Sequence, residues 1–479
     1  MNYSIIRYII GWVLVLEAIF MLMPCLVALI YQEKSGVAFI TTAAICAVIG
    51  LLMIGKKPKN KNYYAREGFV IVSLSWIVMG LFGALPFVLS GEIPSYVDAL
   101  FEIVSGFTTT GASILNDVEA LSHACLFWRS FSHWIGGMGV FVFLLIVLPL
   151  TGGSNMHLMR AESPGPSVGK LVPKVRETAK ILYLIYIVMT IIEMIILLVG
   201  GMPVFDAITL SFGTAGTGGF GIKNSSIADY SVFCQAVITV FMILFGVNFN
   251  FYYYLLGKNK GNAFKMEEVR WYFIIILASI GLITFNIRGQ FESLPMAFHH
   301  AAFQVGSVIT TTGYATSDFN LWPQMSKTIL VLIMFIGACA GSTGGGIKVS
   351  RILIMFKTIG QEIKTLIHPR SVHTMKLDDK AVDKSVVRGV GAFLMTYAVI
   401  FCASLLLITL DGKDLVTNFT AVTATINNIG PGLMDVGPTG NFAGFSVLSK
   451  CVFIFNMLAG RLELYPVLLL FTPAVWRKN

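Results

Sequence analysis

Charged residues are scarce in this 479-residue sequence. Only 12% of its residues are Asp, Glu, Lys or Arg, whereas 56% are hydrophobic, and its mean hydropathy is +0.78. A soluble fold cannot bury that much apolar surface, so the composition predicts a protein embedded in the lipid bilayer. The net charge of +9 does not indicate nucleic-acid binding, because the basic residues lie between hydrophobic segments and not on one aromatic-rich face.

Motifs for metal binding and catalysis are also lacking. The seven cysteines form no Cys-x-x-Cys pair and most lie in apolar segments, which indicates neither a zinc site nor a disulfide framework. The adjacent His299 and His300 would point about 100° apart on a helix, so they are poor joint metal ligands. No nucleophile and base pair or carboxylate dyad stands in a recognisable motif, and we expect neither enzymatic activity nor an organic cofactor. Glu17 and Glu193 are isolated within apolar segments, and both a proton relay and simple contact with neighbouring helices stay open for them.

Ten hydrophobic segments approach the roughly 20 residues that a bilayer core requires. They cover residues 5–30, 37–55, 68–90, 126–150, 181–201, 231–256, 271–288, 327–367 with an interruption, 386–410 and 448–472. The first is longer than a signal-peptide core and lacks a small-residue cleavage site, so we expect it to be retained as a helix. Basic residues gather in alternate connections and in the Arg477-Lys478 tail, which predicts that these connections and both termini are cytoplasmic.

A signature of threonine and glycine occurs four times between hydrophobic segments. The four copies are SGFTTTGAS (105–113), GTAGTGGFG (213–221), GSVITTTGYAT (306–316) and the more divergent ATINNIGPG (424–432). They align without gaps on one anchor glycine each, namely Gly111, Gly219, Gly313 and Gly430. The segments before the anchors, about 95–110, 203–218, 295–312 and 414–429, are too short and polar to cross a bilayer and too apolar for free loops. Such segments are typical of re-entrant half-helices whose ends line water inside the protein.

The sequence therefore predicts an all-α polytopic membrane protein with four helix, pore half-helix, loop and helix repeats around one pseudo-fourfold ion pore. The expected units are an N-terminal helix pair (1–66) and four pore repeats (67–180, 181–269, 270–384 and 385–479). Four backbone loops on one axis can replace the water shell of a dehydrated monovalent cation, and glycine permits the positive φ that such loops need. The residues expected to bind the ion are Thr109, Thr110, Gly111, Thr217, Gly218, Gly219, Thr311, Thr312, Gly313, Asn428, Ile429 and Gly430. One copy alone would be ordinary Thr/Gly packing, but four registered copies argue against that.

With these loops the chain resembles the TrkH/KtrB/HKT superfamily of potassium transporters, and the TrkH type in particular. HLMRAESPGP (157–166), GSTGGGIK (341–348) and NMLAGRLELYP (456–466) carry the resemblance further, and it spans nearly the whole chain. It implies K+ uptake through a gated, selective pore in a prokaryotic inner membrane, a homodimer, and a cytosolic TrkA-type nucleotide-binding regulatory subunit. That subunit would dock on the charged stretch 357–384. Gly216 departs from the expected pattern, which has a bulkier or hydroxylated residue.

A glycine-rich interruption predicts how the pore is gated. Gly341, Ser342, Thr343, Gly344, Gly345 and Gly346 interrupt a hydrophobic segment, and at about 1 kcal/mol per glycine this run cannot be a stable helix. An unwound segment at that depth lines the aqueous path, and the resemblance implies an intramembrane gating loop. A Walker phosphate loop is disfavoured because Ile347 separates the last glycine from the lysine and no strand precedes the run.

Charged and aromatic residues within the spans complete the predictions. Arg461, in the middle of the last span, is expected to limit ion flux, and a structural pair with Glu463 or with helix-end carbonyls is the alternative. Arg129, His133 and Trp134 are expected to anchor their span at the outer membrane interface.

Two other transport functions stay open at this point. A sodium-permeable or cation-coupled relative is the nearer one, although serine at the first filter position accompanies sodium preference in the plant branch and this chain has Gly111. A proton-coupled carrier of another class would use midplane carboxylates at inverted repeats, whereas the repeats here are parallel. Whether protons or sodium accompany potassium as in a symport cannot be derived from the residues.

Overall fold

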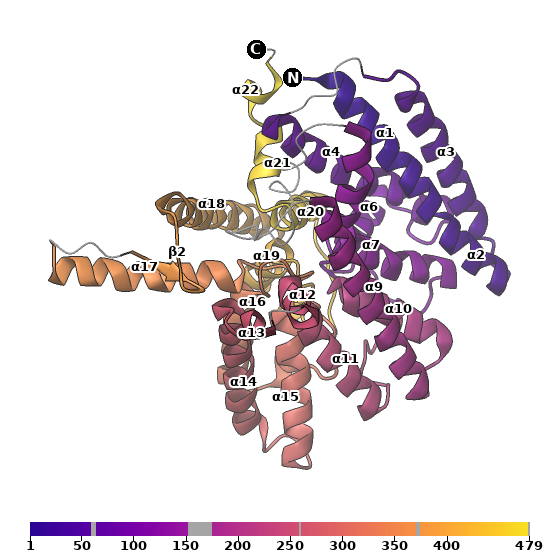
Figure 1. Ribbon diagram of the computed structural model, residues 1–479. Helices are drawn as coiled ribbons and strands as arrows, with labels where there is room; N and C mark the ends of the chain where they lie inside the picture. Colours follow the sequence, from indigo (N-terminus) through magenta and orange to yellow (C-terminus); the bar gives the residue numbers. More distant parts are fainter. Residues whose placement is uncertain (59–63, 152–174, 258–259, 370–373, 478–479) are drawn as a thin grey trace.

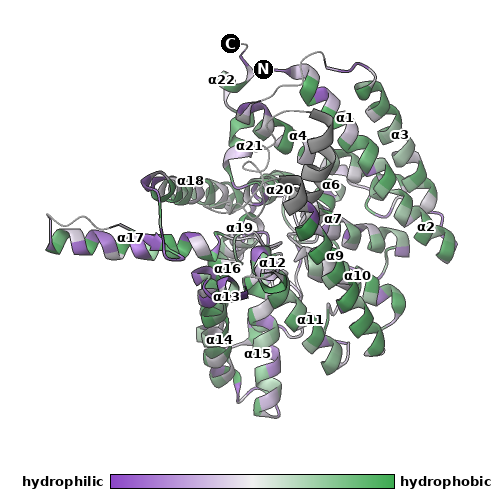
Figure 2. Cartoon of the chain, viewed as in Figure 1, coloured by the Kyte–Doolittle hydropathy of each residue, from purple (hydrophilic) through white to green (hydrophobic). Residues whose placement is uncertain are grey.

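The computed structural model describes residues 1–58, 64–151, 175–257, 260–369 and 374–477 of the chain. The predicted signature at 157–166 lies outside these residues. Within the described part the fold is helical apart from one two-stranded hairpin. Six described helices or helix pairs are long and apolar enough to span a membrane, or seven if one bent pair counts as a span. Hydrophobic residues predominate along most of these helices in Figure 2, and many large apolar side chains are exposed, as expected for a protein whose surroundings are lipid.

The N-terminal helices form a separate layer at one edge of the molecule (Figure 1). They are α1 (Tyr3–Phe20), α2 (Leu22–Tyr31) and α3 (Gly36–Ile54). The predicted first span bends at Met21, because the ring of Pro24 is incompatible with the helical hydrogen bond to the carbonyl of Phe20. Where α1 crosses α3, a Cβ on Gly50 would lie 2.7 Å from the carbonyl oxygen of Gly11. The two backbones therefore pack closely through small residues, as in many membrane helix pairs.

Four further units are arranged around a common centre in Figure 1. The first unit contains α4 (Ala65–Gly83), α5 (Leu85–Leu89), α6 (Tyr96–Phe107) and α7 (His123–Thr151). The second contains α9 (Val175–Val199), α10 (Val204–Gly216), α11 (Val232–Phe245), α12 (Phe249–Leu256) and α13 (Lys260–Phe264). The third contains α14 (Glu267–Ile287), α15 (Leu294–Ile309), η1 (Phe319–Leu321), α16 (Gln324–Ile336) and α17 (Val349–Ile367). The fourth contains α18 (Lys384–Ile408), η2 (Thr409–Asp411), α19 (Leu415–Ile426), η3 (Met434–Val436), α20 (Val447–Arg461), α21 (Tyr465–Leu470) and α22 (Pro473–Trp476).

The predicted re-entrant half-helices are α6, α10, α15 and α19, and each begins within one residue of the predicted start. Each half-helix packs against helices of its own unit and also against the helix that follows the loop of the preceding unit, so that α6 contacts α20, α10 contacts α7, α15 contacts α11 and α19 contacts α16. These contacts join the first unit to the second, the second to the third, the third to the fourth, and the fourth back to the first. The four units therefore form a ring, and the fold class predicted from the sequence is confirmed.

Two predicted spans are wrong as single helices. The span predicted at 231–256 consists of α11 and α12, which meet at an angle of 90°. Gly246 and Phe249, at this bend, bond the interrupted segment of the third unit, because Cys339 N donates to Gly246 O (3.1 Å) and Phe249 N donates to Gly341 O (3.0 Å). These tertiary hydrogen bonds replace those of a continuous helix.

The second wrong span is the one predicted at 448–472. It breaks after Arg461, where Glu463 and Leu464 have positive φ angles of 61° and 65°. Arg461 therefore lies at the end of a helix and not in the middle of one, which corrects the expectation from the sequence.

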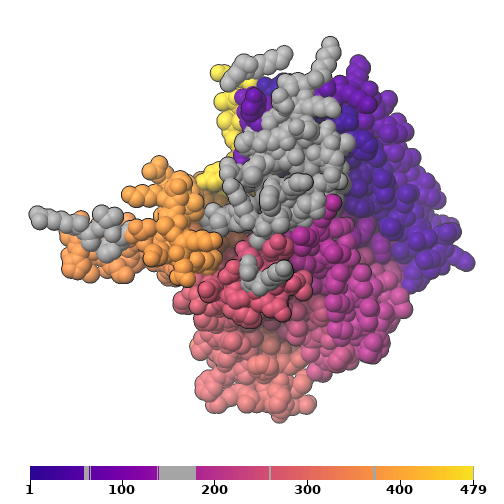
Figure 3. Space-filling view, viewed as in Figure 1, coloured from indigo at the N-terminus to yellow at the C-terminus, as the bar shows by residue number. Residues whose placement is uncertain are grey.

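One helix extends away from the ring of units. Helix α17 projects from the body together with the hairpin of β1 (Lys376–Leu377) and β2 (Lys380–Ala381), as the orange segment of Figures 1 and 3 shows. The strands are antiparallel, with Lys376 opposite Ala381. Along α17 the exposed apolar side chains are Phe356, Ile359, Ile363, Leu366 and Ile367. The helix is amphipathic, and part of its apolar stripe is not covered by the described part of the chain.

Candidate functional site

The four Thr/Gly loops share one backbone conformation. Each anchor glycine has a positive φ, at 77° for Gly111, 78° for Gly219, 88° for Gly313 and 96° for Gly430. Two positions earlier, the residue is also left-handed in every loop, with φ values of 53° at Thr109, 53° at Thr217, 59° at Thr311 and 56° at Asn428. Non-glycine residues in this region cost about 1–3 kcal/mol each and cluster at functional sites. The repetition of this strained position in all four loops marks them as one site.

The same pair of backbone hydrogen bonds ends each half-helix. In the first, Thr109 N donates to Gly106 O (3.0 Å) and Thr110 N donates to Ser105 O (2.8 Å), which is the Schellman arrangement with a left-handed residue after the helix. The other three loops repeat it with Thr217 to Thr214 and Gly218 to Gly213, Thr311 to Val308 and Thr312 to Ser307, and Asn428 to Thr425 and Ile429 to Ala424. The carbonyl end of a helix carries about half an elementary negative charge, so four such ends meet at the loops and favour a cation.

The anchor glycines show that the loops close into a ring. A Cβ on Gly111 would clash with the carbonyl oxygen of Gly218 in the second loop, and a Cβ on Gly219 would clash with that of Thr312 in the third. The ring continues from Gly313 to the carbonyl oxygen of Ile429 and from Gly430 to that of Thr110. Each glycine is therefore in contact with the carbonyl that precedes the anchor of the next loop. The structure brings all twelve residues predicted to bind the ion into this one ring.

The glycine-rich interruption of the third unit lies against the ends of two half-helices. Helix α16 ends at Ile336 and α17 begins at Val349. Between them, Gly345 N donates to Thr311 Oγ1 (2.6 Å) and Gly346 N donates to Asn427 O (3.0 Å). Thr311 lies in the third Thr/Gly loop, and Asn427 directly precedes Asn428 of the fourth. The segment 341–346 is thus unwound and adjacent to the ring of loops.

Arg461 ties this glycine-rich segment to another unit. Its guanidinium donates to Thr343 O (2.7 Å) and to Gly136 O of α7 (2.7 Å). The predicted alternative was a structural pair with Glu463 or with helix-end carbonyls, and the Glu463 carboxylate pairs with Arg351. Two carbonyls, one of them in the glycine-rich segment, hold Arg461 instead.

Two charged residues that support the glycine-rich segment were missed by the sequence reasoning. The buried Glu268 accepts from Ala340 N (2.6 Å) and from Ser350 N (3.1 Å), and so fixes the backbone on both sides of the segment. The buried Lys348 donates to Gly344 O within it. Glu268 lies near the start of α14, where a charged residue is expected simply because the membrane span begins there. The sequence around it therefore does not indicate that it supports the glycine-rich segment.

Arg129 and His133 are not interface anchors, contrary to the prediction. The Arg129 side chain is 2% exposed and its Nε donates to Glu102 Oε1 (2.8 Å), whose own side chain is fully buried. Glu102 also accepts from Ser113 Oγ (3.0 Å) just after the first loop. On the other side, Arg129 donates to Gly221 O (3.1 Å) just after the second loop. The buried ion pair therefore links the backbone that follows the first loop to the backbone that follows the second.

The remaining singled-out residues are two histidines and two buried glutamates. His299 Nε2 is 2.7 Å from Gln235 Oε1 and His300 Nδ1 is 3.0 Å from Thr316 Oγ1, so the two rings have separate partners. Glu17 and Glu193 are buried, and their carboxylate oxygens have no hydrogen-bond partner among the described residues. In that same part of the chain no group of three or more His, Cys, Asp or Glu residues is arranged to hold a metal ion.

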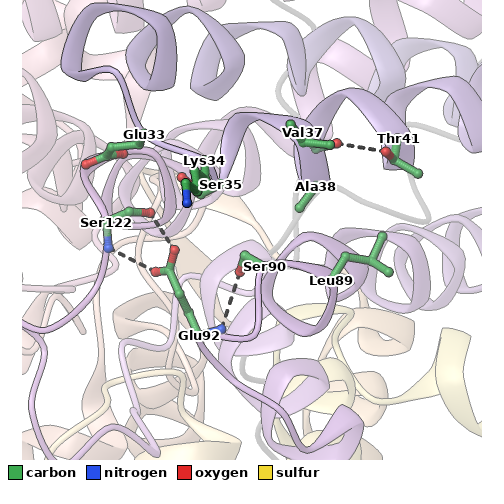
Figure 4. A pocket seen from close by; sticks show the side chains of 10 residues that line it. All are labelled: Glu33, Lys34, Ser35, Val37, Ala38, Thr41, Leu89, Ser90, Glu92 and Ser122. Carbon is green, nitrogen blue, oxygen red and sulfur yellow. Dashed lines mark hydrogen bonds between the residues drawn. The ribbon is translucent and has the colours of Figure 1, made fainter.

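A pocket of about 580 Å³ lies away from the loops, between the turn from α2 to α3, α5 and the start of α7 (Figure 4). Glu92 accepts from Ser122 N and Oγ at its edge (2.9 and 2.6 Å). Burial acts to raise the pKa of the nearby Glu33 carboxyl, but the N–H donors of Ala124 and His123 outweigh it and hold that pKa below the usual value. Both carboxylates thus cap the amino end of α7. None of the predicted site residues lines this pocket.

Comparison with known proteins agrees with this geometry. Residues 34–478 match the family model TrkH, described as cation transport protein. The chain is 39% identical to the Trk system potassium uptake protein TrkH of Salmonella typhimurium over 486 residues, and 35% identical to the Trk system potassium uptake protein TrkG of Escherichia coli over 481 residues. The former match covers all of both chains, and the latter covers 99% of this chain and 98% of the relative. The crystal structure of the potassium transporter TrkH from Vibrio parahaemolyticus superposes with a TM-score of 0.89 at 36% identity and full coverage of both chains.

Proposed function

The chain belongs to the TrkH family of cation transport proteins, and from that premise we propose that it is the membrane subunit of a Trk system that takes up potassium. K+ moves down its electrochemical gradient through the ring of loops, without covalent chemistry. The observation that carries this proposal is the closed ring in which each anchor glycine meets the carbonyl of the next loop. A cation that loses its water shell needs several oxygen dipoles at once, and four converging backbone strands supply them.

The selectivity filter in this proposal consists of the twelve loop residues named above. Their backbone carbonyls bind the dehydrated K+, and the carbonyl ends of α6, α10, α15 and α19 add negative potential from the pore side. The anchor glycines are essential because both their φ angles and the adjacent carbonyls exclude a side chain. Each filter loop belongs to one of the four repeats, which we assign to residues 67–180, 181–269, 270–384 and 385–479.

The gate in this proposal is the glycine-rich segment 341–346 together with Arg461. The segment bonds the ends of the third and fourth half-helices, so a displacement of this segment changes access to the filter. Arg461 adds a positive charge on the same side and holds the segment to α7. Uptake is therefore limited between the filter and the cytoplasm.

The chain termini and the projecting helix α17 support an orientation in the membrane and a set of partners. Tyr3 Oη donates to Trp476 O (2.7 Å), which supports termini on one side of the membrane, and the basic connections favour the cytoplasm of a prokaryotic inner membrane. Helix α17 and the hairpin project from the body. Their exposed apolar stripe and neighbouring lysines suit a second copy of the chain and a cytosolic TrkA-type regulatory subunit.

The filter assignment is tested in cells that lack their own potassium uptake systems. Gly313→Ser places a side chain against Ile429 O at a φ of 88°, and we expect it to abolish growth at low potassium. Gly281→Ser is the matched control, because a Cβ there meets nothing within 4 Å, and it should grow like the wild type. Equal growth of all three at matched protein levels would remove the filter assignment.

A further inference from the structure

The first and third filter loops carry the same side-chain brace. In the first, Thr108 Oγ1 donates to Val104 O (2.6 Å) and lies 2.8 Å from Thr110 Oγ1. Because the Thr108 proton is used on the helix, Thr110 donates to Thr108. The hydroxyls of Thr310 and Thr312 in the third loop are also 2.8 Å apart. Each brace fixes the residue directly before the anchor glycine to its half-helix.

The second loop cannot form this brace, since Gly216 and Gly218 occupy the two positions. The side chain of His133 from α7 fills the space instead. A Cβ on Gly218 would clash with the imidazole ring, and a Cβ on Gly216 would clash with the His133 backbone carbonyl. This explains why Gly216 departs from the pattern that the sequence led us to expect.

The imidazole of His133 makes two hydrogen bonds, one within its own unit and one to the second unit. Its Nδ1 is 2.8 Å from Gly106 O at the end of the first half-helix, and Phe220 N, directly after the second anchor glycine, donates to its Nε2 (3.2 Å). Only the neutral ring with its proton on Nδ1 satisfies both partners. His133 is fully buried, so no water competes for these bonds.

A second residue on the same face of α7 holds the same loop. Arg129, one helical turn before His133, donates to Gly221 O and has its guanidinium 4.1 Å from the centre of the Phe220 ring. Arg129 therefore also constrains the side chain of Phe220, whose N–H His133 binds, and the carbonyl of the next residue. The second loop is held from outside its own unit.

We propose that His133 is the positioning residue of the second filter loop, where its imidazole replaces the missing threonine brace and so sets the ion selectivity of the pore. This inference rests on the proposed function, because selectivity is the property that the loop supplies. It makes the geometry of the second loop depend on a side chain of the first unit.

The test is a mutant cycle of His133 and Gly218, read out as rubidium uptake and as the preference for K+ over Na+ in purified protein reconstituted into liposomes. Gly218 has no positive φ, so the imidazole is the main obstacle to a side chain there. We expect Gly218→Ala alone to reduce uptake by about tenfold or more. In a His133→Ala background the same substitution should be tolerated, with uptake restored toward that of His133→Ala.

Selectivity separates a positioning role from simple packing. We expect His133→Ala to lower the preference for K+ over Na+ by about tenfold, and His133→Gln and His133→Asn, which each keep one of the two bonds, to lower it less. Ser132→Ala is the control, because the hydroxyl of that buried neighbour donates to the carbonyl of Arg129 on its own helix, and the substitution should leave selectivity unchanged. If His133→Ala does not reach the membrane, the K+ over Na+ preference of the Gln and Asn variants decides whether His133 positions the loop.

Wild-type selectivity in the His133 variants, or equal harm from Gly218→Ala in both backgrounds, would overturn this inference. Neither result would affect the proposed function, which fails separately if Gly313→Ser transports like the wild type.

Discussion

Replacing Arg461 with alanine should raise the rate of ion uptake. The guanidinium is held by the carbonyls of Thr343 and Gly136 at 2.7 Å each, so its charge is fixed beside the glycine-rich segment. A K+ ion passing at about 5 Å is repelled by about 3 kcal/mol at an effective dielectric of 20 and by under 1 kcal/mol in bulk water. Because each 1.36 kcal/mol is tenfold in rate, removal of the charge should speed passage by between about fourfold and about 160-fold.

The assay is initial rubidium uptake in cells that lack their own potassium uptake systems, normalised to the amount of protein in the membrane. Arg461→Gln separates the two contributions of the side chain, because glutamine has no charge but keeps amide donors for one of the carbonyls. An increase in both variants assigns the effect to charge, whereas an increase in Arg461→Ala alone assigns it to the carbonyl bonds. Arg288→Ala is the matched control, since Arg288 lies at the end of α14 against the Phe285 ring. Unchanged uptake in Arg461→Ala would refute the reasoning.

Two further predictions concern buried carboxylates. Glu102→Ala leaves the Arg129 guanidinium buried and unpaired, which typically costs about 3–5 kcal/mol, so thermal unfolding in detergent should shift to clearly lower temperature; an unshifted midpoint would contradict the role of the ion pair. Glu268→Ala frees the two backbone N–H groups that flank the glycine-rich segment and should raise basal rubidium uptake. Glu267→Ala, which removes the partner of Lys357, should leave basal uptake unchanged. Equal uptake in the two variants would argue against Glu268 as a support of the gate.

Local patterns in the sequence were sufficient for the half-helices and their loops. The starts of α6, α10, α15 and α19 were predicted within one residue, because Ser, Asp or Pro precedes each apolar segment and the Thr/Gly loop follows it. The anchor glycines could be aligned because a positive φ strongly favours this residue. Both signals depend only on neighbours in the chain.

Breaks within helices were harder to predict. The bend between α11 and α12 falls at Gly246 to Asn248, where there is no proline, and the end of α20 at Arg461 comes five residues before Pro466 of α21. At the bend the backbone groups of Gly246 and Phe249 bond the segment around Gly341, so the interruption depends on a partner that is remote in the chain. Hydropathy alone cannot reveal such a partner.

The sequence by itself determined that this chain is a helical membrane protein with four glycine-anchored loops, since composition, segment length and repeat spacing are local properties. Only the tertiary structure decided that the loops close into one ring, that Glu268 bonds the backbone on both sides of the glycine-rich segment, and that Arg129 and His133 are buried and bond the backbone around the first two loops. Buried polar side chains must find partners, and the partners of these residues lie on other helices or loops. Their roles follow from contacts between residues that are far apart in the chain.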